Sequence, residues 1–245
     1  MNLHRIIAVA CLAVGFATTS IAQTTKEHFQ IADDARAALF NHDYKTALEL
    51  AGKIADSSPN EKYTLVAADT MLRCGESKRA VELFDAHIEN RPADKPYLWQ
   101  RGIALYFLGR YQAGAEQFEI HRKVNPNDVE NAAWHFLCLA KKDSPESAKK
   151  LLLPAPNDSR APMKEVLAML ESGDTDSVKK RMNSFGNDTN RDKSAKFYGN
   201  FYLGLYADAL GDKKTATNHM TTAAKDAPKN YMGDLARVYA RHLER

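Results

Sequence analysis

The amino-acid sequence predicts an all-α protein, a solenoid of helical hairpins. Three prolines, Pro59, Pro92 and Pro126, lie 33 and 34 residues apart, and each closes a block of similar pattern, as in a repeat protein. Within each block, apolar residues recur at three- and four-residue spacing on both sides of a short turn, which is typical of two amphipathic helices. Because one such pair cannot bury its apolar face alone, we expect neighbouring pairs to stack.

Four blocks share a 34-residue register, and they begin at residues 28, 61, 95 and 197. Position 15 falls in the predicted turn, and small residues at positions 8 and 20 allow the paired helices to approach closely. Proline at position 32 ends the second helix, because it lacks an amide hydrogen and disfavours helix in the preceding residue. The small residues are Ala35 and Ala47, Ala68 and Ala80, Gly102 and Gly114, and Gly204 and Ala216.

The central section is degenerate and departs from this register. We expect a fourth helical pair over 132–142 and 147–153, with Pro145 in its turn, a fifth pair over 163–173 and 175–185, and a polar linker over 187–192. The helical spacing of Tyr231–Leu243 has no partner helix, which predicts a C-terminal capping helix. No segment reads as a β-strand.

The first 22 residues have the pattern of a cleavable signal peptide. A short basic start that ends at Arg5 is followed by an apolar run over residues 6–17 and by small residues that end at Ala22. The run is too short to span a membrane, and no other stretch approaches the necessary length. We therefore expect a soluble, exported, periplasmic protein without a transmembrane span, and no lipid anchor at Cys11.

These boundaries divide the chain into four parts: the signal peptide (1–22), three repeats (23–128), the degenerate pairs and linker (129–192), and a last repeat with the capping helix (193–245).

The charge and cysteine content argue against several classes of function. The chain has 34 basic and 31 acidic residues, a formal net charge of +3 and no long run of one sign, so a nucleic-acid partner is not expected. Metal-binding and nucleophile motifs are missing, and we expect no enzyme activity, no cofactor and no metal. Cys74 and Cys138 lie two repeats apart, beyond the reach of a disulfide, which predicts free thiols.

Three histidines recur near the repeat junctions. His87 and His121 both stand at position 27 of their repeats, and His135 opens the following helix. A zinc site would need further ligands at workable spacing, so we expect buried, hydrogen-bonded histidines that serve packing.

The register of these positions resembles that of the tetratricopeptide repeat (TPR) family. In that family the inner, concave face of the array binds partners, and positions 2, 5, 9, 12 and 13 of each first helix face it. The resemblance therefore implies a partner-binding groove of mixed polarity, in which exposed tryptophans would dominate the binding energy. Its predicted residues are Lys62, Asp69, Arg73, Trp99, Ile103, Tyr106, Glu130, Leu137 and Lys141.

A closer resemblance is carried by the run 101–106 (RGIALY), by Trp134, by the run 201–204 (FYLG) and by the interrupted middle of the chain. These features are similar to the new lipoprotein I family of envelope TPR adaptors. That resemblance implies a homodimeric, non-catalytic scaffold that holds other envelope proteins, such as cell-wall hydrolases or proteases. The family carries a lipid-attachment cysteine, which this chain lacks. Two alternatives stay open: a TPR protein whose only function is self-assembly, and an envelope hydrolase.

Overall fold

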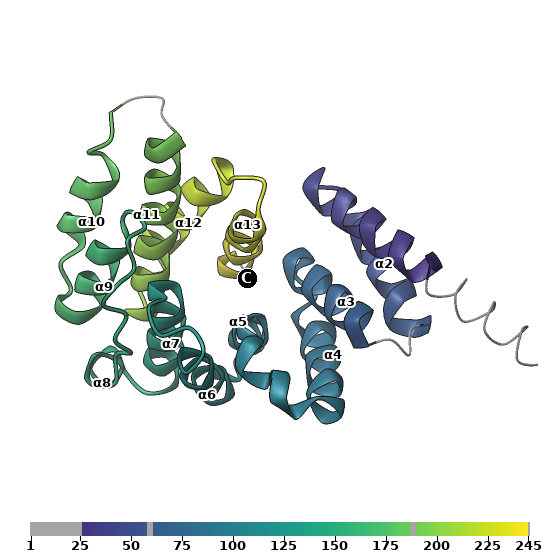
Figure 1. The fold of residues 1–245 in the computed structure, drawn as a ribbon. Coiled ribbons are helices and arrows are strands. Elements are labelled where there is room, and N and C mark those ends of the chain that lie inside the picture. Colours follow the sequence, from purple (N-terminus) through teal and green to yellow (C-terminus); the bar gives the residue numbers. More distant parts are fainter. Residues whose placement is uncertain (1–25, 58–60, 187–189, 245) are drawn as a thin grey trace, which may run out of the picture.

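The computed structural model describes residues 26–57, 61–186 and 190–244, and in these ranges the chain is helical apart from short connections, with no β-strand (Figure 1). A helix over residues 26–40 comes first. The elements that follow are α2 (Tyr44–Ser57), α3 (Glu61–Cys74), α4 (Ser77–Asn90), the 3-10 helix η1 (Pro92–Tyr97), α5 (Trp99–Phe107), α6 (Tyr111–Arg122), α7 (Val129–Lys142), α8 (Pro145–Lys150), α9 (Met163–Ser172), α10 (Thr175–Met182), α11 (Asn190–Ala209), α12 (Lys213–Lys225) and α13 (Tyr231–Leu243).

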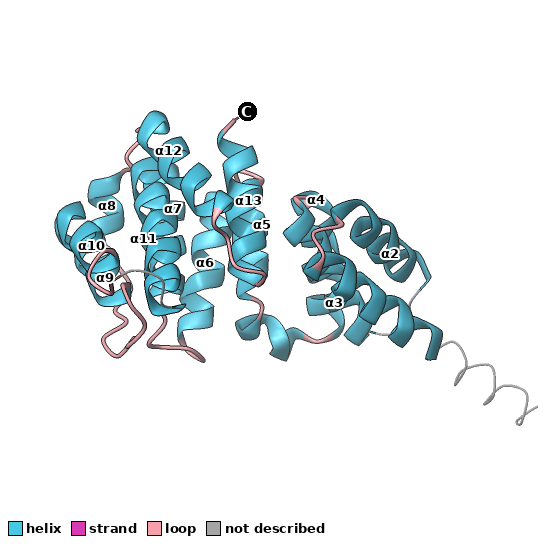
Figure 2. Ribbon diagram, turned by 90° about the horizontal axis from the view of Figure 1, so that it is seen from above, coloured by secondary structure: helices cyan, strands magenta, loops and turns pink. Residues whose placement is uncertain are grey.

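Helices that follow one another along the chain pack against one another. The pairs include α3 with α4, α5 with α6, α9 with α10, and α11 with α12. Viewed from above, the helices from α5 to α13 stand beside one another in one block, and α2 to α4 form a second group (Figure 2). The predicted all-α class is confirmed, and the pairing is that of a helical-hairpin solenoid.

The four turns at position 15 of the regular blocks have the same backbone geometry. In each turn one residue adopts a positive φ, and the amides of that residue and the next bond back to the preceding helix in a Schellman motif. At Gly109, for example, φ is 71°, its amide donates to Tyr106 O (2.9 Å), and the amide of Arg110 donates to Leu105 O (3.0 Å). The four residues with positive φ are His42 (59°), Gly75 (98°), Gly109 (71°) and Gly211 (78°).

The small residues at positions 8 and 20 lie where paired helices touch. All five alanines in this set are fully buried. A Cβ atom on Gly102 would stand 2.6 Å from the Phe118 ring, and one on Gly204 would stand 3.1 Å from the backbone nitrogen of Met220. Larger side chains would therefore force these helices apart.

The degenerate section also forms two helical pairs, α7 with α8 and α9 with α10. Two details of the prediction are wrong. Pro145 is the first residue of α8 rather than part of the turn, and Ser144 caps that helix by accepting from the Ser147 amide, an arrangement that suits a proline. The linker is shorter than expected, because α11 begins at Asn190 and buries Asp192.

The helix Tyr231–Leu243 forms with the predicted bounds and packs on α12, the last helix of the last repeat, but it also contacts helices far from that end of the solenoid. Helix α13 lies on the concave side of the array, between α12 and α3 and beside α5 (Figure 1), and it packs against both α12 and α3. It buries Leu235, Ala236 and Tyr239 completely. In the sequence this helix has no second helix with which to form a hairpin, and in the structure it packs on helices of different repeats instead.

Two predictions lie outside the described residues: the signal peptide over 1–22, and the turn that contains Pro59. Among the helices that the structure describes, none combines the length and apolar character of a membrane span.

The turn geometry makes a prediction about two glycines. Gly109 has a positive φ and open space around its Cβ position, so Gly109→Ala should lower the free energy of unfolding by about 1 kcal/mol through backbone strain alone. Gly52, inside α2, also has open space but no positive φ. Gly52→Ala should therefore raise stability by about 0.5–1 kcal/mol. Urea unfolding of both variants measures this, and two changes of the same sign would contradict it.

Candidate partner-binding groove

The middle of the concave face is filled by side chains of α13. The Tyr239 ring packs against Tyr106 and Trp134, with centroids 5.7 Å apart in each case, and against Phe201 at 6.3 Å. These rings come from α5, α7 and α11, and they are buried. Helix α13 therefore occupies the central part of the groove that the sequence assigned to a partner.

A buried carboxylate fixes this arrangement. Asp208 of α11 accepts hydrogen bonds from the hydroxyls of Tyr106 (2.5 Å) and Tyr239 (2.6 Å) and from the ammonium group of Lys141 (2.6 Å). Burial raises the pKa of both tyrosines, and the neighbouring Asp208 charge raises them further, so both keep the protons they donate. One side chain thus joins α5, α7, α11 and α13.

A second carboxylate holds the other side of α13. Asp234 accepts hydrogen bonds from Arg73 Nε (2.9 Å) and Nη2 (2.7 Å) and from the Tyr44 hydroxyl (2.9 Å). Burial, followed by the hydrogen bond to Asp234, raises the pKa of Tyr44 to about 12. Both Arg73 bonds reach Oδ2 and the Tyr44 bond reaches Oδ1, and these charge-assisted contacts tie α13 to α2 and α3.

The nine predicted groove residues separate into four groups. Ile103, Tyr106 and Leu137 are at most 1% exposed, so their assignment to an accessible groove is wrong: α5 and α7 are covered on their concave side. Lys141 lies at the edge, paired with Asp208. Asp69, Arg73, Trp99 and Glu130 line cavities that remain open, and the Lys62 side chain lies outside the described residues.

Sequence reasoning also missed residues that hold the groove together. Asp208 stands at position 12 of the block that begins at residue 197, and position 12 is one of the concave positions. The repeat register could therefore have predicted that Asp208 faces the groove. Asp234 and Arg160 lie outside the regular blocks, and no repeat position indicates them.

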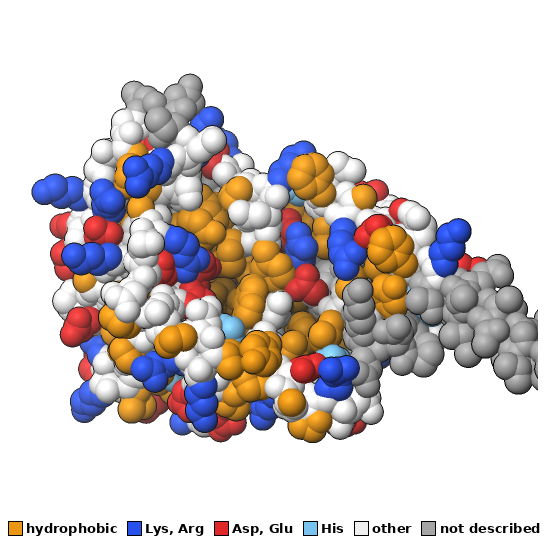
Figure 3. Space-filling model, in the orientation of Figure 1, with side chains coloured by type: hydrophobic (Ala, Val, Ile, Leu, Met, Phe, Trp, Pro, Cys, Tyr) orange, Lys and Arg blue, Asp and Glu red, His pale blue; other side chains and the backbone are white. Residues whose placement is uncertain are grey.

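One open region, which we call the N-terminal cavity, lies beside the first helix and α3. It has a volume of about 290 Å³, and its walls combine Leu65 and Val66 with Arg36, Asp69 and Arg73. In the orientation of Figure 1, hydrophobic side chains gather in a hollow in the middle of the molecule, and charged side chains surround them (Figure 3).

A second open region, the Trp99 cavity, lies beside the first turns of α5, α7 and α13. Its volume is about 270 Å³, and its walls include Trp99, Trp134 and Tyr231 together with Glu130 and Arg160. Trp99 and Tyr231 form an edge-to-face pair with ring centroids 4.9 Å apart.

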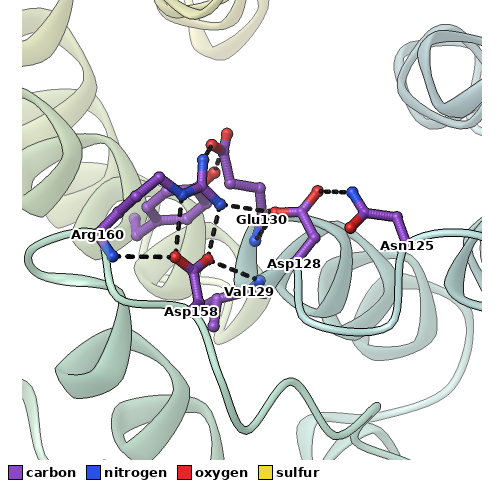
Figure 4. Close-up of polar contacts among 7 residues, drawn as sticks. Asn125, Asp128, Val129, Glu130, Asp158 and Arg160 are labelled. Carbon is purple, nitrogen blue, oxygen red and sulfur yellow. Dashed lines mark hydrogen bonds and ion pairs between the residues drawn. The ribbon is translucent and has the colours of Figure 1, made fainter.

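The polar wall of the Trp99 cavity is a cluster of three carboxylates around Arg160 (Figure 4). The guanidinium donates to both oxygens of Asp158 (3.0 and 2.6 Å), to Asp128 (2.8 Å) and to Glu130. Asp158 and Asp128 also accept the first backbone amides of α7, where carboxylates are stabilised by the helix dipole. The segment 151–162, which interrupts the repeats, therefore positions Arg160 at the groove.

The histidines and thiols serve packing. His87, His121 and His135 are buried and bond to Asp94, the Pro96 carbonyl and Glu119 respectively, as predicted. The two cysteines within the described residues, Cys74 and Cys138, are free, and burial raises the pKa of each thiol, that of Cys74 to about 12. Across the described ranges, no group of three or more His, Cys, Asp or Glu side chains is arranged to hold a metal.

No known protein-family model matches the sequence. The fold and the groove therefore define the class of protein by structure: an all-α helical-hairpin array whose last helix lies in its own concave face.

Asp208 provides a direct test of how α13 is held. Asp208→Asn removes the charge opposite Lys141 and should lower the free energy of unfolding by about 3 kcal/mol. Urea unfolding followed by circular dichroism measures the change. The control is Asp56→Asn, at an exposed ion pair with Arg79, which should change stability by less than about 0.5 kcal/mol. Equal small effects would contradict the role of Asp208.

Asp69 predicts a pH dependence of stability. Burial raises its pKa to about 6, against the opposing charge of Arg73, so the folded protein binds this proton more tightly than the unfolded chain. The favourable contribution is therefore gained as the pH falls below 6 and is lost above it. From pH 7.5 to 5, the wild type should gain about 1 kcal/mol of stability relative to Asp69→Asn. Parallel unfolding curves for the two proteins would contradict the raised pKa.

Proposed function

We propose that the protein is an exported, non-catalytic TPR scaffold that binds a segment of another envelope protein in the part of its concave groove that α13 leaves open. The observation that carries this proposal is the N-terminal cavity, which is lined by Arg36 and Leu39 of the first helix, the helix that also carries two exposed phenylalanines. Phe29 and Phe40 of the first helix are 50% and 58% exposed. Large exposed aromatics beside a cavity are typical of a protein-binding surface.

The phenylalanines belong to the same face as the cavity. Phe29 and Phe40 stand at positions 2 and 13 of the first block, and Arg36 and Leu39, at positions 9 and 12, line the cavity. Lys229 lies over the Phe40 ring, 4.9 Å from its centroid, so the aromatic edge reaches towards the segment that enters α13. A bound segment would meet an apolar floor with charged residues on both sides.

The assignment to the TPR class is supported by agreement between register and geometry. Position 15 has a positive φ in all four regular blocks, and positions 8 and 20 hold buried alanines or tightly packed glycines. Export is supported by the signal-peptide pattern of residues 1–22. Hydrolases or proteases of the cell envelope are the clients that the family resemblance implies.

The proposal predicts that partner capture depends on the two phenylalanines. Residues 23–245 would be immobilised, exposed to envelope extract, and the eluates identified by mass spectrometry. The double variant Phe29→Ser, Phe40→Ser should lose the captured protein, and affinity for that protein, once purified, should fall at least tenfold.

The matched control substitutes two equally exposed apolar residues at other sites, Leu151→Ser and Leu210→Ser, which are 56% and 48% exposed. Capture should persist in this control, and equal loss in both double variants would contradict the groove assignment. Sedimentation velocity tests the alternative of self-assembly: a dimer that dissociates only in the phenylalanine variant would assign this surface to a second copy of the chain.

A further inference from the structure

The Trp99 cavity has a composition that the proposed partner groove does not explain. Its walls include the half-buried rings of Trp99 and Tyr231. Its polar wall carries Asp128 and Glu130 together with the Arg160 guanidinium to which both are paired. Aromatic faces attract cations through their quadrupole, and carboxylates attract them directly.

The charges around the cavity do not balance. Three carboxylates, those of Asp128, Glu130 and Asp158, face the single guanidinium of Arg160. That guanidinium already donates four hydrogen bonds to them, so it has little capacity for an incoming anion. Burial raises the pKa of Glu130, against the opposing charge of Arg160. Its second oxygen accepts from the Tyr202 hydroxyl (2.8 Å), a neutral donor that adds no positive charge.

The other cation near the aromatic walls is neutralised. Arg73 lies over the Tyr231 ring, 5.1 Å from its centroid, but it is paired with Asp234 at 2.7 Å and with Asp69 at 3.7 Å. This contact also shows that the Tyr231 ring accepts a guanidinium group.

Two buried atoms of the cavity walls lack hydrogen-bond partners. These are Asn131 Oδ1 and Trp134 Nε1, and both side chains line the cavity. Asn131 Oδ1 is an acceptor that an ammonium or guanidinium group can satisfy, whereas the indole Nε1–H is a donor and needs an acceptor such as water. Buried polar atoms without partners are uncommon in a filled core, and they accompany sites that a ligand or ordered water completes.

We propose that the Trp99 cavity receives one basic side chain, a lysine or an arginine, of the protein segment bound in the groove. The cavity's volume of about 270 Å³ is enough for one long side chain and too small for a folded element. This inference rests on the proposed scaffold function and adds the chemistry that its partner must present.

The test uses a capped pentapeptide, Gly-Gly-Lys-Gly-Gly, compared with peptides that carry arginine, norleucine or glutamate at the centre. Both tryptophans of the chain line the cavity, so their fluorescence reports binding, and calorimetry gives the affinity. The lysine and arginine peptides should bind at least tenfold more tightly than the norleucine peptide, and this preference should weaken with added salt. Three results would overturn the proposal: the norleucine peptide binds as tightly as the lysine peptide, the glutamate peptide binds more tightly, or the lysine peptide shows no binding at about 20 mM.

Variants locate the site. Glu130→Gln removes a charge with little change of shape, and Trp99→Leu removes an aromatic wall; each should weaken lysine-peptide binding about tenfold, as measured by calorimetry. Tyr97→Leu is the control, because Tyr97 is an exposed aromatic residue outside the cavity. Circular dichroism checks that each variant is folded, and if Glu130→Gln is not, Trp99→Leu still decides the result.

Failure here is distinguishable from failure of the scaffold function. If the lysine peptide does not bind while capture still depends on Phe29 and Phe40, the groove stands and the cation site is overturned. If the lysine peptide binds selectively while capture is independent of the phenylalanines, the cation site stands and the N-terminal cavity is not the partner surface.

Discussion

The carboxylate of Asp208 is the constraint on which the arrangement of this protein depends. Burying a charge is costly unless donors surround it, and here the donors come from three different helices: Tyr106 of α5, Lys141 of α7 and Tyr239 of α13. None of these helices can shift without leaving the charge unsatisfied. The position of α13 in the concave face is therefore set by polar chemistry at its centre as well as by ring packing around it.

This constraint determines which parts of the concave face remain available. The aromatic side chains of α5, α7 and α11 that meet Tyr239 are covered, whereas the N-terminal cavity and the Trp99 cavity stay open beside α13. The two cavities differ in chemistry. Leu65 and Val66 give the first an apolar floor, whereas the second lies beside the Arg160 cluster, in which carboxylates outnumber the guanidinium. A partner segment that contacts both would need an apolar part and a basic side chain.

Much of the fold was predictable because it depends on short-range pattern. The small residues at positions 8 and 20 and the turn residues at position 15 each describe contacts within one hairpin, and the structure has them there. The site was predictable only in part. Assigning Ile103, Tyr106 and Leu137 to an open groove assumed that nothing covered them. Their burial depends on tertiary packing: Tyr106, for example, is covered by Tyr239 of α13, 133 residues away in the sequence, and no local period encodes such a contact.

The contact of Asp234 with Tyr44 and Arg73 spans 190 and 161 residues of sequence. In an open solenoid each unit touches only its neighbours, so terminal units can fray while the rest stays folded. Here the last helix is bonded to the first repeats, and the array is closed upon itself. Loss of either end therefore removes contacts from both, which couples the repeats into one cooperative unit and gives the chain a higher contact order, and hence slower folding, than a linear array of the same hairpins.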